Sequence, residues 1–335
     1  MGLLRRWLRR LPFLAYRERL AGEQRAFRDV VDVNALPRIY DYWAWKHLKP
    51  LFEEFGFSDV DTFFVNALRA SALRTGAARP VFLSVGAGNC DLEVRLGKAL
   101  RAQGLAQFTF ECLDFNAAML ARGRALAERE GLATHFEFTK GDFNRWKARR
   151  HYDGILASHS LHHVVALEHL FDAIRAALAP RAYFVVSDMI GRNGHQRWPE
   201  ALVEVQRFWA ELPASHRYNH QLKRHEERFL DWDCSGEGFE GIRAQDILCE
   251  LVKRFEFPMF LAFGNLIDVF VDRAFGPNFS VESAWDLEFI DRVHARDEEL
   301  LRAGKLTPTH MLAILSTEPA ACVGNRGQTP ILPLV

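Results

Sequence analysis

The chain has 335 residues, and its 43 lysines and arginines are balanced by 43 aspartates and glutamates, so the formal net charge is zero. Hydrophobic residues make up 49% and charged residues 26% of the chain, which is ordinary for a soluble globular protein. The length suffices for one large domain with additions or for two small ones. The neutral balance gives no electrostatic reason to expect a nucleic-acid partner.

Cysteine usage indicates a reducing compartment. The five cysteines are odd in number and none has CxxC spacing: Cys90, Cys112, Cys234, Cys249 and Cys322. We therefore expect free thiols and a cytoplasmic protein, with neither a disulfide framework nor a metal site.

The first residues mix arginines with leucines and a tryptophan. Arginines at positions 5, 6, 9 and 10 interleave with Leu3, Leu4, Trp7, Leu8 and Leu11. The apolar run is too short and too often interrupted to span a membrane or to form the core of a secretory signal. Two hypotheses remain: a basic amphipathic helix lying weakly on the inner membrane surface, or a terminal helix that packs on the domain or frays.

Residues 1–78 are predicted to form an N-terminal helical extension. Aromatic residues at helical spacing over 36–57 predict a helix that is broken near Pro50, with Tyr40, Trp43 and Leu48 among its packing residues. A second helix is expected over 59–73, ending near Gly76.

From Val81 onward, predicted strands and helices alternate. The strands are expected over 81–85, 107–114, 135–142, 152–160 and 182–190, with helices over 91–103, 116–130 and 164–178. Because each parallel connection must cross over the sheet, this alternation predicts an α/β fold with a doubly wound, mostly parallel, Rossmann-like sheet. We assign residues 79–190 to this core.

The alternation stops after residue 190. Residues 191–255 mix helical stretches with polar and aromatic loop signals, which predicts a largely helical insertion that caps a substrate. Late strands within 257–272 and 310–317 would return the chain to the sheet, so we assign residues 256–320 to this part. Residues 321–335 are expected to be a C-terminal tail.

Ligands bind beyond the carboxyl ends of the strands in such a sheet. The polar or glycine residues that follow the five predicted strands are Gly86, Gly88 and Asp91, then Asp114, then Asp142, then His159 and Ser160, and finally Asp188. Asp91 stands where the dinucleotide fingerprint G-x-G-x-x-G has its third glycine. Its charge would stabilise a helix N-terminus but oppose a phosphate, so we expect a nucleoside-like ligand without phosphate at this loop.

Two further acids suit a nucleoside. Asp114 ends the second strand, where a carboxylate accepts hydrogen bonds from ribose hydroxyls, although it would also serve as a helix N-cap. Asp142 is placed to meet an adenine amino group with Phe143 stacking alongside, although Gly-Asp is also common turn chemistry.

Four motifs in order, VFLSVGAGN, FECLDFN, FTKGDF and YDGILASHSLHHV, resemble those of the class I S-adenosylmethionine-dependent methyltransferases over residues 80–190. The resemblance implies a seven-stranded sheet and S-adenosylmethionine as the cofactor. The implied cofactor contacts are Gly86, Ala87, Gly88, Asp91, Asp114, Phe115, Asp142, Phe143, Ser158 and His159. Family members often have an acid at position 84, where this chain has a serine, and we expect Glu93 or Asp91 to take its place.

Methyl transfer from a sulfonium depends mainly on positioning, and an oxygen acceptor also needs a base to take its proton. The candidate catalytic residues are His159, His195 and Asp188, and the candidate acceptor-binding residues are His162, Arg192, Asn193, Arg197 and Tyr218. His163 is a further histidine of the same cluster. The arginine-rich segment after the fifth strand suits a hydroxylated or anionic acceptor, and the glycines of 233–241 suggest a lid.

The leading hypothesis is therefore an O-methyltransferase of a small-molecule or glycan-like hydroxylated acceptor, with His159 or His195 as base. N- or C-methylation of a small metabolite stays open. A non-catalytic binding module built on the methyltransferase fold is the competing class. An RNA methyltransferase is disfavoured because the chain is neutral and lacks a basic appended module.

Overall fold

The structure is a computed structural model that describes residues 16, 18–22, 35–236, 238–327 and 330. The basic amphipathic helix predicted near the N-terminus lies outside these residues. Among the described helices, none combines the length and the apolar character needed to cross a membrane. The cytoplasmic location and the membrane-surface association stay predictions.

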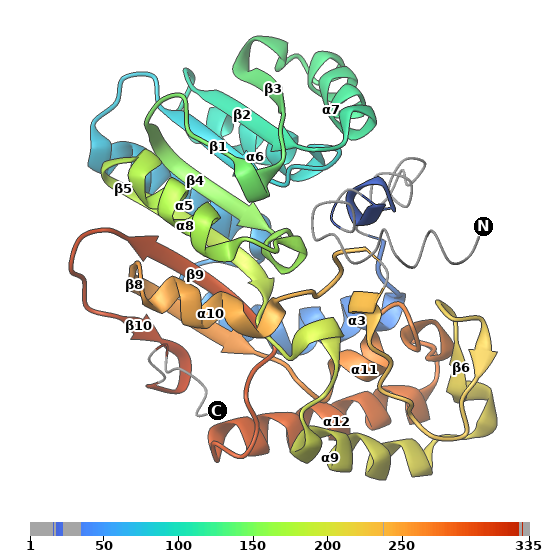
Figure 1. The fold of residues 1–335 in the computed structure, drawn as a ribbon. Helices are drawn as coiled ribbons and strands as arrows, with labels where there is room; N and C mark the ends of the chain where they lie inside the picture. The colour runs from blue at the N-terminus through green and yellow to red at the C-terminus, as the bar shows by residue number, and fades with distance from the viewer. Residues whose placement is uncertain (1–15, 17, 23–34, 237, 328–329, 331–335) are drawn as a thin grey trace, which may run out of the picture.

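An eight-stranded sheet forms the centre of the molecule (Figure 1), with the strand order β10-β8-β9-β5-β4-β1-β2-β3. Its strands are β1 (Val81–Val85), β2 (Thr109–Asp114), β3 (Phe136–Lys140), β4 (Tyr152–Ser158), β5 (Leu178–Met189), β8 (Glu256–Phe263), β9 (His310–Ser316) and β10 (Val323–Gly324). The first five strands run parallel, and β9 is antiparallel to both β5 and β8. The predicted α/β fold with a mostly parallel sheet is therefore confirmed.

The eighth strand lies in the predicted tail. Val323 and Gly324 of β10 pair in parallel with Met259 and Phe260 of β8. A two-residue strand leaves almost no periodic signal in a sequence, so the sequence predicts only a tail over 321–335.

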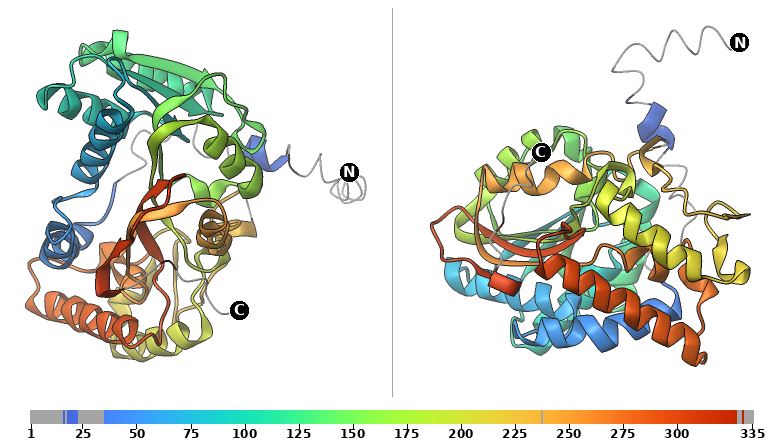
Figure 2. Two further views of the ribbon diagram at one scale, coloured as in Figure 1. Left: turned by 90° about the vertical axis from the view of Figure 1, so that its left-hand side faces the viewer. Right: turned by 90° about the horizontal axis from the view of Figure 1, so that it is seen from below.

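Helices cover both faces of the sheet (Figures 1 and 2). One face carries α5 (Val60–Thr75), α6 (Asp91–Ala102) and α7 (Ala117–Arg129), and the other carries α8 (Leu167–Ala177) and α10 (Ala244–Val252). Neighbouring strand residues point to opposite faces: Phe82 lies in the apolar cluster of the first face, and Leu83 lies in that of the second.

The predicted helix over 36–57 is not broken near Pro50. The chain forms α3 (Arg38–Trp43), a π-helical turn η1 (Ala44–Leu48) and α4 (Lys49–Glu53), with Pro50 in the first turn of α4. A proline ring clashes with the carbonyl four residues earlier and has no N–H to donate. The wider π turn accommodates this without ending the helix.

The helix predicted over 59–73 is confirmed as α5. The Asp59 side chain accepts a hydrogen bond from the Thr62 N–H, and the Thr62 hydroxyl lies within bonding distance of the Asp59 N–H, which is a capping box. The helix ends at Gly76, whose φ of 71° is the left-handed conformation that favours glycine.

A helical lobe lies at one end of the sheet, where both views show α9 and α12 side by side (Figures 1 and 2). It contains α9 (Pro199–Glu211), α11 (Asp268–Val271) and α12 (Ala284–Arg302). Phe208 of α9 packs against Phe270 of α11 and Phe289 of α12. The predicted insertion thus folds together with later residues, and the 19-residue helix α12 stands where only late strands were expected.

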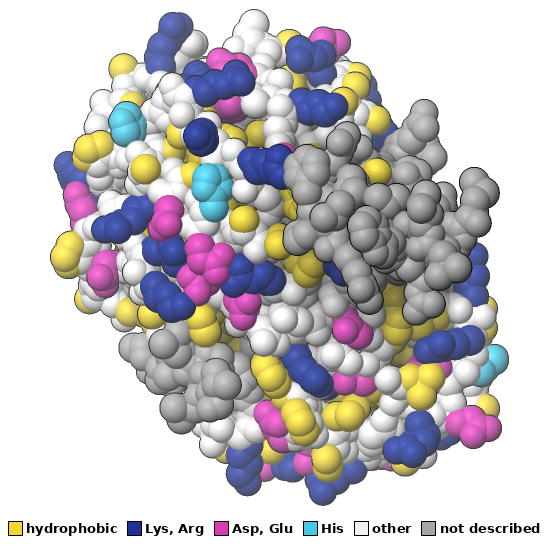
Figure 3. Space-filling view, in the orientation of Figure 1, with side chains coloured by type: hydrophobic (Ala, Val, Ile, Leu, Met, Phe, Trp, Pro, Cys, Tyr) yellow, Lys and Arg dark blue, Asp and Glu magenta, His cyan; other side chains and the backbone are white. Residues whose placement is uncertain are grey.

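Short elements complete the described chain. The strands β6 (Tyr218–Asn219) and β7 (Arg224–His225) form a separate hairpin. The 3-10 turns are η2 (Ala133–His135), η3 (Phe143–Arg145), η4 (Leu161–His163), η5 (Asn193–His195), η6 (Ala214–Arg217), η7 (Cys234–Gly236), η8 (Gly276–Asn278) and η9 (Asn325–Gly327). On the face drawn in Figure 3, basic and acidic side chains are interspersed, as the neutral composition predicts.

Candidate active site

The loop after β1 approaches the loop after β4 so closely that a side chain would not fit. A Cβ at Gly86 would lie 2.5 Å from the Cβ of Ser160, and the φ of Gly86 is +74°. The Gly86 N–H donates to the carbonyl of Leu113 in β2 at 2.9 Å. Glycine is therefore required here both by space and by backbone conformation.

Asp114 ties the end of β2 to this glycine loop. Its two carboxylate oxygens accept hydrogen bonds from the backbone N–H of Gly88 at 2.9 Å and of Asn116 at 2.7 Å. Burial raises the pKa of Asp114 and outweighs these two hydrogen bonds, which lower it. The N-cap of α7 is Asn116 rather than Asp114. Since a carboxylate has about four lone-pair sites, Asp114 keeps acceptor capacity for ribose hydroxyls.

Asp142, predicted to meet adenine, bonds to a residue that the sequence did not point to. The hydroxyl of Tyr16 lies 2.8 Å from both carboxylate oxygens of Asp142, and the Asn144 N–H donates to one of them at 3.0 Å. Burial raises the pKa of Tyr16, and Asp142 raises it further, so the phenol stays a neutral donor. The adenine contact of Asp142 stays a prediction.

The N-terminal segment also contacts the predicted lid. The Tyr16 ring packs on Phe239, with ring centroids 5.4 Å apart. The Arg19 guanidinium donates to the carbonyls of Ser235 and Gly238 at 3.2 and 3.0 Å. Two segments more than 200 residues apart in sequence thus meet beside the end of β3.

The remaining predicted cofactor residues lie at the same edge of the sheet. Phe115 packs edge-on against Phe143 at 5.7 Å; Phe143 is buried, and Phe115 is partly exposed. Ser158 ends β4 opposite Ser187 of β5, and Asp91 begins α6.

Of the two acids expected to take the place of an acid at position 84, Glu93 is the one that contacts Ser84. The Ser84 hydroxyl donates to its carboxyl oxygen Oε1 at 2.6 Å. Glu93 is only 2% exposed, and its other oxygen has no hydrogen-bond partner among the described residues. Burial raises the pKa of Glu93 to about 7.

His159, a predicted base, immediately follows β4. Its backbone has a φ of +48°, which is uncommon outside glycine, and its N–H donates to the carbonyl of Ser187 at 2.8 Å. The side chain is exposed. Desolvation by the surrounding protein nevertheless disfavours the imidazolium and lowers the pKa of His159 to about 4. The ring is therefore neutral at pH 7.

Asp188, predicted to be catalytic, is buried and fully engaged by internal donors. One oxygen accepts from the backbone N–H of Ser160 and Leu161 at 2.9 and 2.8 Å, and the other from the N–H of Met189 at 2.8 Å. The second oxygen also lies 2.6 Å from Nδ1 of His162. Burial raises the pKa of Asp188, but His162 outweighs it and lowers the value to about 2. Asp188 is thus placed to orient His162.

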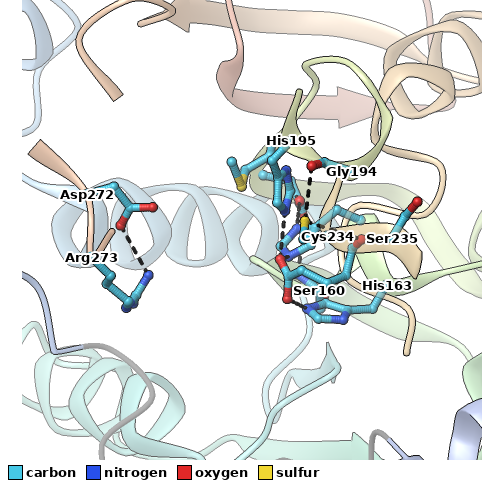
Figure 4. A network of polar contacts seen from close by, with 12 residues as sticks. Ser160, His163, Gly194, His195, Cys234, Ser235, Asp272 and Arg273 are labelled. Atoms are coloured by element: carbon cyan, nitrogen blue, oxygen red, sulfur yellow. Dashed lines mark hydrogen bonds and ion pairs between the residues drawn. The ribbon is translucent and has the colours of Figure 1, made fainter. Parts of the chain in front are cut away.

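Glu240, a residue of the predicted lid, lies among three histidines. Its carboxylate oxygens are 2.6 Å from Nε2 of His195, 3.4 Å from Nε2 of His162 and 3.5 Å from Nε2 of His163. Figure 4 shows His163 and His195 in this network, with Ser160 beside them. Glu240 was missed because nothing local in the sequence connects it to histidines about 45 to 80 residues away.

The charge states of this cluster follow from burial and from the two carboxylates. Burial lowers the pKa of His162, but Asp188 and Glu240 outweigh it and raise the value to about 10. Burial lowers the pKa of His195 despite its hydrogen bond to Glu240. The histidines hold the pKa of Glu240 far below its usual range.

Some predicted acceptor residues have structural partners instead. Arg197 is buried, and its guanidinium donates to the carbonyl of Asn265 at 2.6 Å and pairs with Asp268 at 3.2 Å. Asn193 and Gln245 exchange two hydrogen bonds between backbone and side chain. These contacts hold the loop after β5 in place.

Arg192 and Tyr218 occupy different surroundings. Arg192 donates to the carbonyl of Arg197 at 3.1 Å and lies over the ring of Trp198. Tyr218 belongs to the β6–β7 hairpin, where it packs against His220 and His225. The structure therefore gathers His159, His162, His195 and Asp188 at one place but leaves Tyr218 in a separate hairpin.

Residues 83–184 match the family model described as a methyltransferase domain. This part of the chain is therefore similar to methyltransferase domains, in agreement with the resemblance of its four motifs. The strand ends fit S-adenosylmethionine, the cofactor that the resemblance implies, because Gly86 and Gly88 carry no side chains and Asp114 retains acceptor capacity beside them. A search of curated proteins gave no match to the chain.

Solved structures with similar folds include several methyltransferases. A putative sarcosine dimethylglycine methyltransferase from Galdieria sulphuraria is 16% identical, with 78% of this chain and 86% of that chain covered and a TM-score of 0.38. The StiE O-MT is 10% identical, with 81% of each chain covered and a TM-score of 0.43. Geranyl diphosphate C-methyltransferase from Streptomyces coelicolor A3(2), solved with Mg²⁺, geranyl diphosphate and S-adenosyl-L-homocysteine, is 11% identical, with 75% and 78% covered and a TM-score of 0.41.

We expect Asp114→Asn to weaken S-adenosylmethionine binding at least tenfold. A hydrogen bond to a charged group contributes about 1.5–3 kcal/mol, and about 1.4 kcal/mol corresponds to a factor of ten in affinity. Titration calorimetry measures the loss. Asp153→Asn is the matched control, because Asp153 also accepts a backbone N–H, that of Val81 at 2.9 Å, but at the opposite end of the sheet. Equal affinities for the Asp114→Asn variant and the wild type would contradict the assignment.

We expect Glu93→Gln to stabilise the cofactor-free protein at pH 8 but not at pH 4. The carboxyl has a folded pKa of about 7 against an ordinary value of 4.5, so the folded state binds the proton more tightly. Stability therefore falls as the pH rises from about 4.5 to 7, by about 3 kcal/mol, and is then level. Chemical unfolding at both pH values measures this, with the exposed Glu128→Gln as control. An equal effect of Glu93→Gln at both pH values would argue against a protonated carboxyl.

We expect Tyr16→Phe to loosen residues 18–22, because the substitution removes the hydrogen bond to Asp142 and keeps the ring contact with Phe239. Hydrogen exchange of these amides should become faster. Tyr42→Phe is the matched control, since the Tyr42 hydroxyl also bonds an aspartate, Asp291, elsewhere. Unchanged exchange in the Tyr16→Phe variant would mean that this hydrogen bond does not hold the segment.

Proposed function

We propose that this chain transfers the methyl group of S-adenosylmethionine to a hydroxyl oxygen of a small-molecule or glycan-like acceptor. The observation that supports this most is the position of His159. This exposed histidine directly follows β4 and precedes Ser160, the residue in closest approach to Gly86 of the cofactor loop. A neutral imidazole at that place suits proton abstraction from a hydroxyl beside the cofactor.

The chemistry is an in-line displacement. When bound, S-adenosylmethionine would supply an electrophilic methyl group on a sulfonium, and the electron pair of the broken C–S bond would stay with its sulfur, giving a neutral thioether. The acceptor oxygen forms the new bond to carbon, and His159 takes its proton. Asp114 and the glycine loop hold the nucleoside, so that the methyl group is aligned with the acceptor, which is the main contribution in such a step.

His195 is the second candidate for the base. Its Nε2 faces Glu240 at 2.6 Å, and its Nδ1 is buried without a hydrogen-bond partner among the described residues. An acceptor hydroxyl would have to reach Nδ1 to use it. The exposed ring of His159 is easier to reach, so we favour His159. Arg192 remains our proposal for an acceptor contact.

The acceptor is identified first, by incubating the protein with methyl-labelled cofactor and a fractionated extract of its source cell. Mass spectrometry of the labelled product then tells O-methylation from N- or C-methylation. If the protein binds no S-adenosylmethionine at millimolar concentration in calorimetry, the enzyme proposal fails and a binding module with this fold takes its place.

With that acceptor, we expect His159→Ala to lower kcat by about 10²–10⁴-fold, because general base catalysis contributes that much. His169→Ala is the matched control, since His169 lies on α8 and bonds the carbonyl of Trp146. Steady-state kinetics with both variants checks this. If alanine at both 159 and 195 left turnover intact, the assignment of the base to these histidines would be wrong.

A further inference from the structure

The carboxylate of Glu240 lies close to the ring nitrogens of three histidines, which is more than its own hydrogen bonding requires. The candidate ligand atoms of His162, His163 and Glu240 all lie within 4.8 Å of one another. His162 is 4% exposed, and the other two residues are partly buried. His162 and His163 belong to the η4 turn after β4, and Glu240 belongs to the segment before α10. It is therefore the fold, and not a short spacing in the sequence, that brings the three residues together.

The distances within this group suit a shared cation better than direct hydrogen bonds. Oε1 of Glu240 lies 3.4 Å from Nε2 of His162, and the other oxygen, Oε2, lies 3.5 Å from Nε2 of His163, whereas an N–H···O bond in proteins measures about 2.7–3.2 Å. Ligand atoms about 2.0–2.2 Å from a tetrahedral zinc ion lie about 3.3–3.6 Å from one another. Both distances fall in that range.

A second layer of contacts orients the group. Nδ1 of His162 lies 2.6 Å from Oδ1 of Asp188, which directs Nε2 of the same ring toward Glu240. Metal-binding histidines usually donate their other ring N–H to a carboxylate in this way. Nε2 of His195 lies 2.6 Å from Oε1 of Glu240, the oxygen that also faces His162, and supports the carboxylate.

We propose that His162, His163 and Glu240 form a binding site for a divalent transition-metal ion, with Asp188 and His195 as positioning residues. Two imidazoles and one carboxylate favour Zn²⁺, Co²⁺ or Ni²⁺ over Mg²⁺ or Ca²⁺, which prefer oxygen ligands. Three protein ligands leave a fourth position open, as in catalytic zinc sites. The cysteine-based expectation of no metal site did not consider these residues.

The open position offers a place for the acceptor. A hydroxyl bound there would have a lowered pKa, and His159 would then remove its proton more readily. This role rests on the proposed O-methylation, whereas the metal site itself does not.

Metal binding is tested on the full-length chain, treated with chelator and dialysed, without cofactor or acceptor. We expect calorimetry with ZnCl₂ and with CoCl₂ to give one ion per chain. We expect Glu240→Gln and His163→Ala each to weaken binding at least tenfold, and Asp188→Asn to weaken it 10–100-fold, as loss of an outer carboxylate typically does. The bound Co²⁺ should show intense visible absorption that Glu240→Gln abolishes.

The matched control is His216→Ala. His216 also pairs with a carboxylate, since its Nε2 lies 3.0 Å from Asp286, but in the helical lobe, and this variant should bind metal like the wild type. Circular dichroism confirms that each variant is folded. Absence of binding in the wild type, or binding that neither Glu240→Gln nor His163→Ala weakens, would overturn the proposal. Since neither acceptor nor turnover enters this test, its outcome is independent of the proposed O-methylation.

Discussion

The buried carboxylate of Asp188 is the interaction on which the candidate site depends. It accepts backbone hydrogen bonds from Ser160 and Leu161 after β4 and from Met189 at the end of β5, and it holds the ring of His162. A buried charge persists only when it is paired and hydrogen-bonded, and these donors meet that condition. The same contacts fix the loop that carries His159, bring Ser160 close to Gly86 of the glycine loop, and direct the ring of His162 toward Glu240.

A second buried acid holds the helical lobe on the sheet. Asp268 of α11 pairs with Arg197 of the loop after β5, accepts the hydroxyl hydrogen bond of Thr309 and lies 3.2 Å from His310 of β9. Arg197 in turn donates to the carbonyl of His195 at 3.1 Å. The backbone of His195 is thus fixed from the lobe, and its ring meets Glu240. Arg197, predicted to contact the acceptor, thus also helps to fix the position of this histidine.

The elements that the sequence predicts correctly share one property: each follows from a local pattern. The alternation of apolar runs with helical periodicity locates β1, β2 and β4 within a few residues, and with them Gly86, Asp114 and His159 at the carboxyl edge. The same reasoning could not find Tyr16, Glu240 or β10, because their roles depend on contacts with residues far away along the chain.

The sequence by itself therefore determined the order of strands and helices over residues 79–190, the glycine loop, and the acids at the strand ends, because these depend on backbone preferences and on the alternation of buried residues. Only the tertiary structure decided what those side chains contact. In the fold, Asp188 contacts His162, Asp142 is hydrogen-bonded to Tyr16, and Arg197 pairs with Asp268. Three histidines lie around Glu240. The physical reason is that burial and charge pairing depend on which elements pack together in space. The separation of two residues along the chain does not indicate whether their elements do so.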